Sequence, residues 1–168
     1  MFDAPVLGVD PGTAASGLAV VSGPPSRPTV LWAHTLRTPA GQAPAERLHR
    51  LHGAVAEAIR DHRPLAVALE RLMWGRNAGS AMEVARASGA VMVAAAEAGL
   101  SVEEYAPLEV KMAVTGVGNA PKAQLRRALG LILGASAVPD EPDAADAVAV
   151  AVCHLYQSRL RALRRVAT

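Results

Sequence analysis

The sequence predicts an α/β fold with a five-stranded mixed sheet, three antiparallel strands and then two parallel ones, flanked by helices. Short apolar runs of strand length recur along the chain, and short connections join the first three. Longer helical patterns separate the later runs, and a strand, a crossover helix and another strand place the two strands parallel. At 168 residues, with 51% hydrophobic and 19% charged residues, the chain fits one globular domain.

The first predicted strand, residues 6–9, is apolar without polar alternation, which is typical of a central strand buried on both faces. Asp10 follows it. Pro11 fixes φ and Gly12 permits positive φ, so the chain reverses and residues 18–21 return as a hairpin partner. Asp10 therefore ends a central strand, where it either caps the turn through the backbone or meets a cation.

The next elements bring a second carboxylate to the same edge. Residues 29–36 form a third strand, and apolar residues at helical spacing predict a helix over 44–61. Residues 65–69 form a fourth strand, which Glu70 closes. With the fourth strand beside the first, Glu70 and Asp10 lie together at the edge where open α/β sheets build their sites.

The middle of the chain leaves two pairs of alternatives. The loop over 71–78 carries Met73 and Trp74, which either belong to the core or act as a wedge or stacking platform for bases. A helix over 79–98 is apolar nearly all round, so both of its faces should be covered. It is either a buried helix in a monomer or the contact with a second subunit, and its small residues favour a dimer.

The C-terminal part is predicted as a fifth strand at 101–105, a short helix at 107–113, a basic amphipathic helix at 121–133 and a last helix. Asp140 is the expected N-cap of the last helix, with Pro142 in its first turn.

Four carboxylates from three distant parts of the chain are candidates for one site: Asp10, Glu70, Asp143 and Asp146. Asp146 lies on the same helix face as Asp143, before an Ala- and Val-rich stretch that must be buried, so it needs a cation. Carboxylate oxygens suit Mg²⁺ or Mn²⁺. A cluster holding two such ions ~3.5–4 Å apart performs in-line phosphoryl displacement, so these residues predict a metal-dependent phosphodiesterase.

The overall charge says little about partners, because the formal net charge is +2 although the pI is about 9.1. Basic clusters within 159–165 and 122–127 either contact phosphates or form solvated helix faces. The single cysteine, Cys153, fits a reducing, cytoplasmic setting. No apolar run reaches the roughly 20 residues of a membrane span, and no signal peptide is expected.

Short motifs occur in a defined order along residues 5–157. They are LGVDPGT at 7–13, LER at 69–71, NAGSA at 77–81, EYAP at 104–107, VK at 110–111, VGNAPK at 117–122 and DAADA at 143–147. Each motif alone is a weak signal, but the ordered set is specific. It resembles the RuvC family of bacterial Holliday-junction resolvases, which have a ribonuclease H-like fold.

The resemblance assigns roles to individual residues. The family's catalytic metal ligands are matched by Asp10, Glu70, Asp143 and Asp146, which implies two Mg²⁺ ions per active site, with Mn²⁺ as an alternative. Basic residues near the scissile phosphate are matched by Lys111 and Lys122. The loop residues expected to bind DNA are Met73, Trp74, Arg76 and Asn77. Met73 stands where the family often has an aromatic wedge, so base stacking either passes to Trp74 or is weaker.

The resemblance also implies the activity and the partners. A nuclease domain over residues 1–158, followed by a basic tail over 159–168, would act as a homodimer with two clefts. Each subunit would cut one of two like-polarity strands of a four-way DNA junction and leave 5′-phosphates. RuvA and RuvB, the branch-migration proteins, are the implied partners in recombination and repair.

Two other classes of function remain as alternatives. A sugar-kinase or actin-like ATPase also carries Asp-x-Gly-Thr after a first strand, but that fold repeats its core twice and needs far more than 168 residues. The second alternative is a junction-binding module without catalysis, or an RNA-directed nuclease with the same fold.

Overall fold

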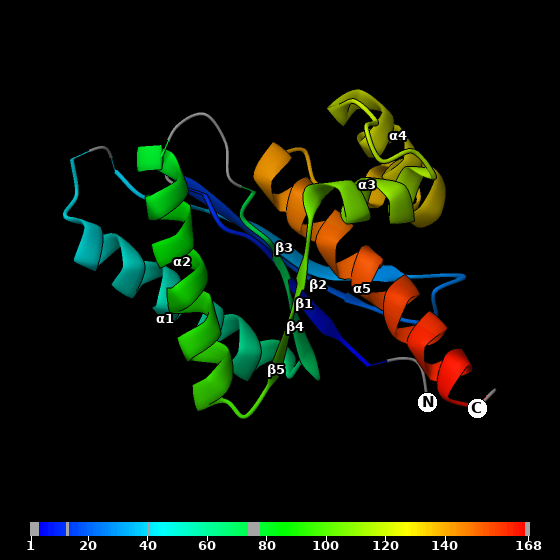
Figure 1. The fold of residues 1–168 in the computed structure, drawn as a ribbon, viewed down its shortest axis with the longest axis horizontal. Helices are drawn as coiled ribbons and strands as arrows, with labels where there is room; N and C mark the ends of the chain where they lie inside the picture. Colours follow the sequence, from blue (N-terminus) through cyan, green and yellow to red (C-terminus); the bar gives the residue numbers. More distant parts are fainter. Residues whose placement is uncertain (1–3, 13, 40, 74–77, 167–168) are drawn as a thin grey trace.

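The computed structural model describes residues 4–12, 14–39, 41–73 and 78–166, with the backbone alone for 78 and 159–166. One mixed sheet organises the molecule, in the order β3-β2-β1-β4-β5 (Figure 1). Its strands are β1 (Val6–Asp10), β2 (Ala15–Ser22), β3 (Thr29–Arg37), β4 (Ala66–Glu70) and β5 (Ser101–Tyr105). The pairs β1–β2 and β2–β3 are antiparallel, whereas β1–β4 and β4–β5 are parallel. The predicted fold class is confirmed.

Helices cover both faces of this sheet. One face carries α1 (Pro44–His62) and α2 (Ala78–Glu97), and the other carries α3 (Pro107–Thr115), α4 (Lys122–Leu133) and α5 (Pro142–Val166) (Figure 1). A short 3₁₀ turn, η1 (Ala135–Ala137), follows α4. None of the helices in the described part of the chain is long and apolar enough to cross a membrane.

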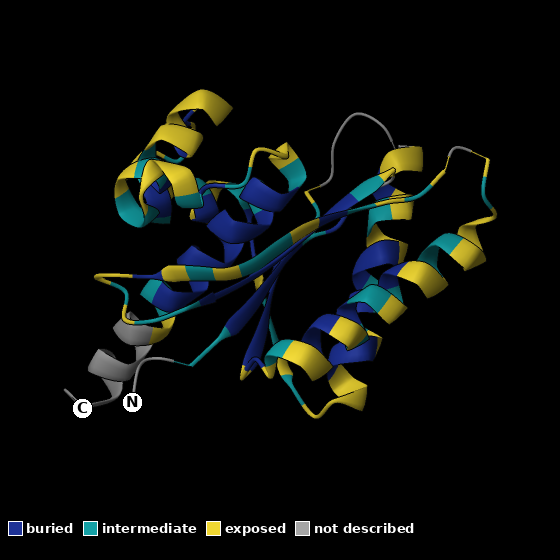
Figure 2. Cartoon of the chain, turned by 180° about the vertical axis from the view of Figure 1, so that it is seen from behind, coloured by how far each residue is buried: buried dark blue, intermediate teal, exposed yellow. Residues whose placement is uncertain are grey.

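The central strand β1 explains why its sequence lacks polar alternation. Leu7 and Val9 belong to the core beneath α1 and α2, whereas Val6 belongs to the core beneath α5. Successive side chains of a strand point to opposite faces, so helices on both sides bury every residue of β1 before Asp10. Figure 2 shows the buried central strands between helices whose outer faces are exposed, whereas the edge strand β3 is only partly buried.

The beginning of α5 differs from the prediction. The helix starts at Pro142, and the carbonyl of Glu141 accepts the first helical bond, from the amide of Ala145. Glu141 is therefore the N-cap, and the assignment of Asp140 was wrong. Asp140 instead accepts a hydrogen bond from Arg126 of α4 at 3.3 Å, because docking of α4 offers its carboxylate a charged partner.

Helix α2 has one covered and one open face in the single chain. Its inner face, with Ala87, Val91 and Ala94, belongs to the core that α2 shares with α1 and the sheet. Met82 and Val93 are about half exposed, at 54% and 52%. The second apolar face expected from the sequence is present, and the dimer that it favours stays a prediction.

Candidate active site

Two of the four carboxylates meet through strand pairing. Val9 of β1 lies opposite Leu69 of β4 in a parallel register, so the next residues, Asp10 and Glu70, end side by side. The Asp10 carboxyl is hydrogen-bonded to Glu70, and an acid can share such a bond with a second carboxylate only when a proton lies between them. The predicted juxtaposition of Asp10 and Glu70 is confirmed.

Helix α5 delivers the other two carboxylates because two glycines let it approach the sheet. Gly17 lies opposite Asp10 in the β1–β2 pair. A Cβ atom on Gly17 would collide with the backbone carbonyl of Asp143, and one on Gly8 would collide with the next turn of α5. The missing side chains therefore allow the first turns of α5, with Asp143 and Asp146, to lie directly over the end of β1.

The electrostatics of Asp10 report how close the four groups are. Burial is the largest cause that raises the pKa of Asp10 from 3.8 to about 9. The charge of Glu70 and its hydrogen bond follow, and then the charges of Asp146 and Asp143. Segments that are far apart in the sequence thus bring their acidic side chains within electrostatic reach of Asp10, at the end of the central strands where the sequence analysis expected them.

Lys122, the first residue of α4, contacts this acidic group. Its Nζ donates a hydrogen bond to Oδ2 of Asp146 at 2.8 Å. This bond is the main cause that raises the pKa of Lys122; desolvation acts against it, and the charges of Asp146, Asp10 and Asp143 add to it. The cation that the sequence requires beside Asp146 is, in this structure, a lysine ammonium.

The chemistry of the donors fits a divalent cation, although the described residues do not form a closed metal cage. No group of three or more Asp, Glu, His or Cys side chains in that part of the chain is arranged to hold an ion as it stands. Two interactions occupy carboxylate oxygens instead, the Asp10–Glu70 hydrogen bond and the Lys122–Asp146 ion pair. The candidate ligands are all carboxylates, and one of them already binds the ammonium of Lys122. Such oxygen ligands suit Mg²⁺ or Mn²⁺.

The remaining predicted site residues are basic or belong to the loop after β4, and the structure describes only some of them. Lys111 lies on α3, and no ion pair within the described residues joins it to the carboxylates. Met73 lies in the segment after β4 and is 58% exposed, so the core alternative is wrong for this side chain. Trp74, Arg76 and Asn77 lie outside the described residues.

Arg71 is a supporting residue that the sequence analysis missed. Its amide donates to the carbonyl of Tyr105 at 2.8 Å, and its guanidinium lies 3.5 Å from the carboxylate of Glu109. The same Glu109 accepts a hydrogen bond from the amide of Ala106 at 2.7 Å. These contacts fasten the chain directly after Glu70 to β5 and α3. An arginine directly after an acidic strand end is the one sequence signal for it.

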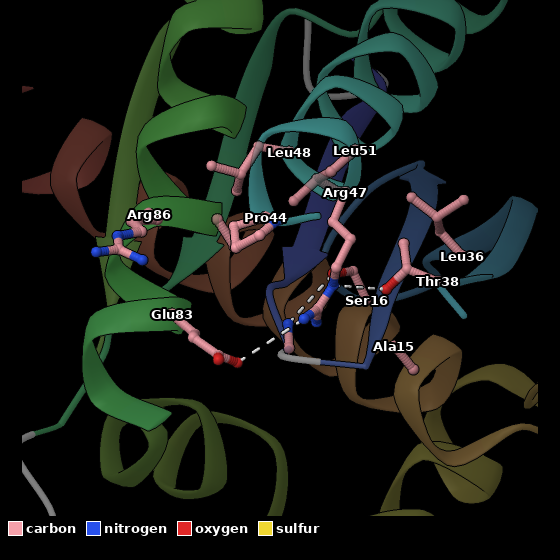
Figure 3. A pocket seen from close by; sticks show the side chains of 12 residues that line it. Ala15, Ser16, Leu36, Thr38, Pro44, Arg47, Leu48, Leu51, Glu83 and Arg86 are labelled. Carbon is pink, nitrogen blue, oxygen red and sulfur yellow. Dashed lines mark hydrogen bonds and ion pairs between the residues drawn. The ribbon is translucent and has the colours of Figure 1, made fainter. Parts of the chain in front are cut away.

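A pocket borders the turn after Asp10 on the face covered by α1 and α2 (Figure 3). Arg47 of α1 crosses it, donating to Thr38 at 3.1 Å and lying 4.0 Å from Glu83 of α2. The amide of Gly12 donates to Ser16 at its edge. None of the four carboxylates lines this pocket, so the pocket is separate from the acidic site.

The sheet order, with acidic residues at the ends of the two central strands, defines a protein of ribonuclease H-like fold. The family model described as "Crossover junction endodeoxyribonuclease RuvC" matches residues 6–154. This chain belongs to the RuvC family.

Curated relatives and solved structures agree with this assignment. The chain is 43% identical over 149 residues to a RuvC of Moorella thermoacetica, covering 89% of each chain. It is 43% identical over 162 residues to a RuvC of Azorhizobium caulinodans, covering 96% of this chain and 95% of the relative. Among solved structures, Thermus thermophilus RuvC in complex with a Holliday junction substrate matches with a TM-score of 0.88 and 36% identity. That match covers 94% of this chain and 96% of the Thermus chain.

A more distant likeness supports the fold alone. The yeast mitochondrial Holliday junction resolvase Ydc2 matches with a TM-score of 0.70 and 13% identity. The match covers 96% of this chain and 82% of the yeast chain. The ribonuclease H-like architecture predicted from the motifs is therefore shared by both kinds of neighbour.

Proposed function

We propose that this chain is a Holliday junction resolvase, an endodeoxyribonuclease that cuts four-way DNA junctions in recombination and repair. The observation that carries the proposal is the convergence of four carboxylates from β1, β4 and α5 in a chain of the RuvC family. An ATPase of the actin-like kind is not a member of this family, and a junction-binding module without catalysis needs no cluster of partly buried carboxylates. An RNA-directed nuclease of the same fold would need such a cluster too, so a comparison of substrates has to separate it from a resolvase.

The proposed ligands of two Mg²⁺ ions, or Mn²⁺ ions, are Asp10, Glu70, Asp143 and Asp146. When bound, the ions supply the charge neutralisation and nucleophile activation of in-line phosphoryl displacement. The protein fixes the acids at the ends of strands and on the first turns of one helix, so they are positioned before DNA arrives. Asp10 must lose its proton before it can bind a cation, because metal ligands are deprotonated.

Basic and loop residues complete the proposed DNA site. Lys111 and Lys122 would contact the backbone near the scissile phosphate, where an ammonium acts as a point charge. The loop after Glu70 is the proposed contact with the opened junction, through Met73, Trp74, Arg76 and Asn77. The exposure of Met73 supports this role, since a buried side chain could not reach a base.

The proposed assembly is a homodimer that makes paired, symmetric nicks and leaves 5′-phosphates. The open apolar face of α2 supports it, because two like cuts across a four-way junction require two related active sites. RuvA and RuvB would be the partners, in the cytoplasm. The proposed nuclease domain covers residues 1–158, and the basic tail of residues 159–168 continues α5 as far as Val166.

Carboxylate substitutions test this function on a synthetic four-way junction with Mg²⁺. Asp10→Asn, Glu70→Gln and Asp146→Asn are expected to abolish cleavage and keep junction binding, because each removes a ligand charge without changing the side-chain shape. Denaturing gels report cleavage, and mobility shifts without metal report binding. Linear duplex and RNA–DNA hybrid substrates separate a resolvase from other nucleases of this fold. Full cleavage by the Asp146 variant would remove that residue from the catalytic set.

A further inference from the structure

Lys122 and Asp146 form an ion pair between a flexible, exposed side chain and one whose position is held by its helix. The Lys122 side chain is 76% exposed, whereas that of Asp146 is 21% exposed beside the buried part of α5. Lysine carries its charge on a flexible four-carbon stem, so its ammonium can leave Asp146 without any backbone movement. Asp146 cannot move away in the same manner, because it projects from a helix packed on the sheet.

The backbone that carries Lys122 is fixed by a second contact. One turn along α4, Arg126 donates to the carbonyl of Pro139 at 2.7 Å and to Asp140 at 3.3 Å. Both acceptors precede α5, so α4 is tied to the segment that leads into the acidic helix. Arg126 therefore anchors the element, and the ammonium of Lys122 is the part that is free to exchange.

The position of this ammonium has a direct electrostatic effect. The negative charges of Asp143 and Asp146 oppose ionisation of Asp10, and the positive charge of Lys122 lies beside the same carboxylates and offsets part of their charge. A divalent cation held by Asp146 would do the same in place of the ammonium. The two cations would therefore compete for the negative charge of one carboxylate.

We infer that Lys122 is a resident counter-ion: its ammonium holds Asp146 in the metal-free protein and competes with a divalent ion for that carboxylate. The inference rests on the proposed function, since it takes Asp146 as a metal ligand. It assigns to Lys122 a second task besides phosphate contact, that of lowering the metal affinity of the DNA-free protein. Metal loading and substrate binding then use the same side chain.

The experiment measures Mn²⁺ affinity without DNA, by the loss of the free-ion signal in electron paramagnetic resonance. Lys122→Met removes the charge and keeps most of the stem, and the exposure of Lys122 makes the variant compatible with the fold. We expect about two- to fivefold tighter Mn²⁺ binding than in the wild type, as for loss of a competing, largely exposed ion pair. Lys111→Met is the matched control, because it removes an equal charge that has no ion pair with the carboxylates.

Asp146→Asn and the double variant Lys122→Met/Asp146→Asn complete a thermodynamic cycle. Asp146→Asn should weaken Mn²⁺ binding, and adding Lys122→Met to it should change the affinity by less than twofold. Unchanged or weaker binding by Lys122→Met overturns the inference, and so does equal tightening by Lys111→Met. If Asp146→Asn binds Mn²⁺ as the wild type does, the ligand set of the proposed function fails as well. Weak binding by Asp146→Asn together with no gain in Lys122→Met overturns the counter-ion alone.

Discussion

Asp10 combines burial with three acidic neighbours, and its proton therefore affects the stability of the fold. The pKa of Asp10 in the folded, metal-free protein is about 9, above the usual 3.8 of an unfolded chain. Between these two values the folded state holds a proton that the unfolded state has released. The free energy of unfolding then falls as the pH rises through this window, and the contribution of Asp10 is complete only below about pH 4.

This linkage gives a prediction for metal-free protein treated with EDTA. The melting temperature should decrease from pH 5 to pH 9, and Asp10→Asn should show a flatter profile because it has no carboxyl to ionise. Added Mg²⁺ should raise the melting temperature more at pH 9 than at pH 6, since a deprotonated site binds metal better. Circular dichroism melts at each pH check this. Parallel profiles for wild type and Asp10→Asn would contradict it.

Some residues of the site could be predicted from the sequence, and the roles of others depend on tertiary packing that the sequence does not show. Asp10 and Glu70 were predictable because each closes a short apolar strand, and two parallel strands bring their ends together. The partner of Lys122 was not predictable, because it depends on how α4 packs against α5. The role of Arg71 depends in the same manner on β5 and α3, which lie some 30 residues further along the chain.

At the scale of elements, the contact between β2 and α5 determines whether the acids meet. Gly17→Ala should push the first turn of α5 away from β1, since its Cβ would collide with backbone that cannot rotate aside. We expect a loss of about 1–3 kcal/mol in stability, typical of overpacking, and a loss of cleavage larger than the stability loss explains. Chemical denaturation and single-turnover cleavage measure the two effects.

Gly53 offers the matched control for this substitution. It lies inside α1, and a Cβ there would meet nothing within 4 Å. Gly53→Ala should therefore stabilise the protein by about 0.5–1 kcal/mol through helix propensity and leave cleavage unchanged. Wild-type cleavage by Gly17→Ala would show that α5 does not need this close approach.

The hydrophobic periodicity predicted which segments are helices and which are strands, but it predicted the ends of these elements less accurately. The apolar spacing of α1 and the strand-length runs gave the right structures because tertiary packing agrees with local preference. The N-cap of α5 was misplaced by one residue, because Asp140 is a good capping residue by type but is held by Arg126. A charged partner from another helix outweighed the local rule.

At the scale of the whole molecule, the open face of α2 determines the expected assembly. Val93→Glu should convert a dimer into a monomer, because a carboxylate in an apolar interface must be desolvated without a partner. Light scattering after gel filtration measures the mass, and cleavage should become unpaired nicking. Leu131→Glu, at an 83% exposed position of α4, is the control and should leave the mass unchanged. A monomeric wild type at working concentration would contradict the dimer.

The arrangement of the sheet followed from the sequence because few topologies satisfy the connection rules. Two hairpin connections and two crossovers leave little choice once β1 is known to be buried on both sides. What the sequence alone did not reveal is what covers the second face of α2, since an apolar stripe looks the same whether it packs inside one chain or against a second copy of the protein.

Helix α5 begins at the acidic site and runs to the opposite end of the sheet, the end at which β1 begins (Figure 1). Its 25 residues correspond to about 37 Å of helix at 1.5 Å per residue. An affinity tag or a fluorescent dye fused at either end would therefore sit far from the phosphate being cut. Immobilised or labelled protein should therefore keep its acidic site accessible to a bulky, branched DNA.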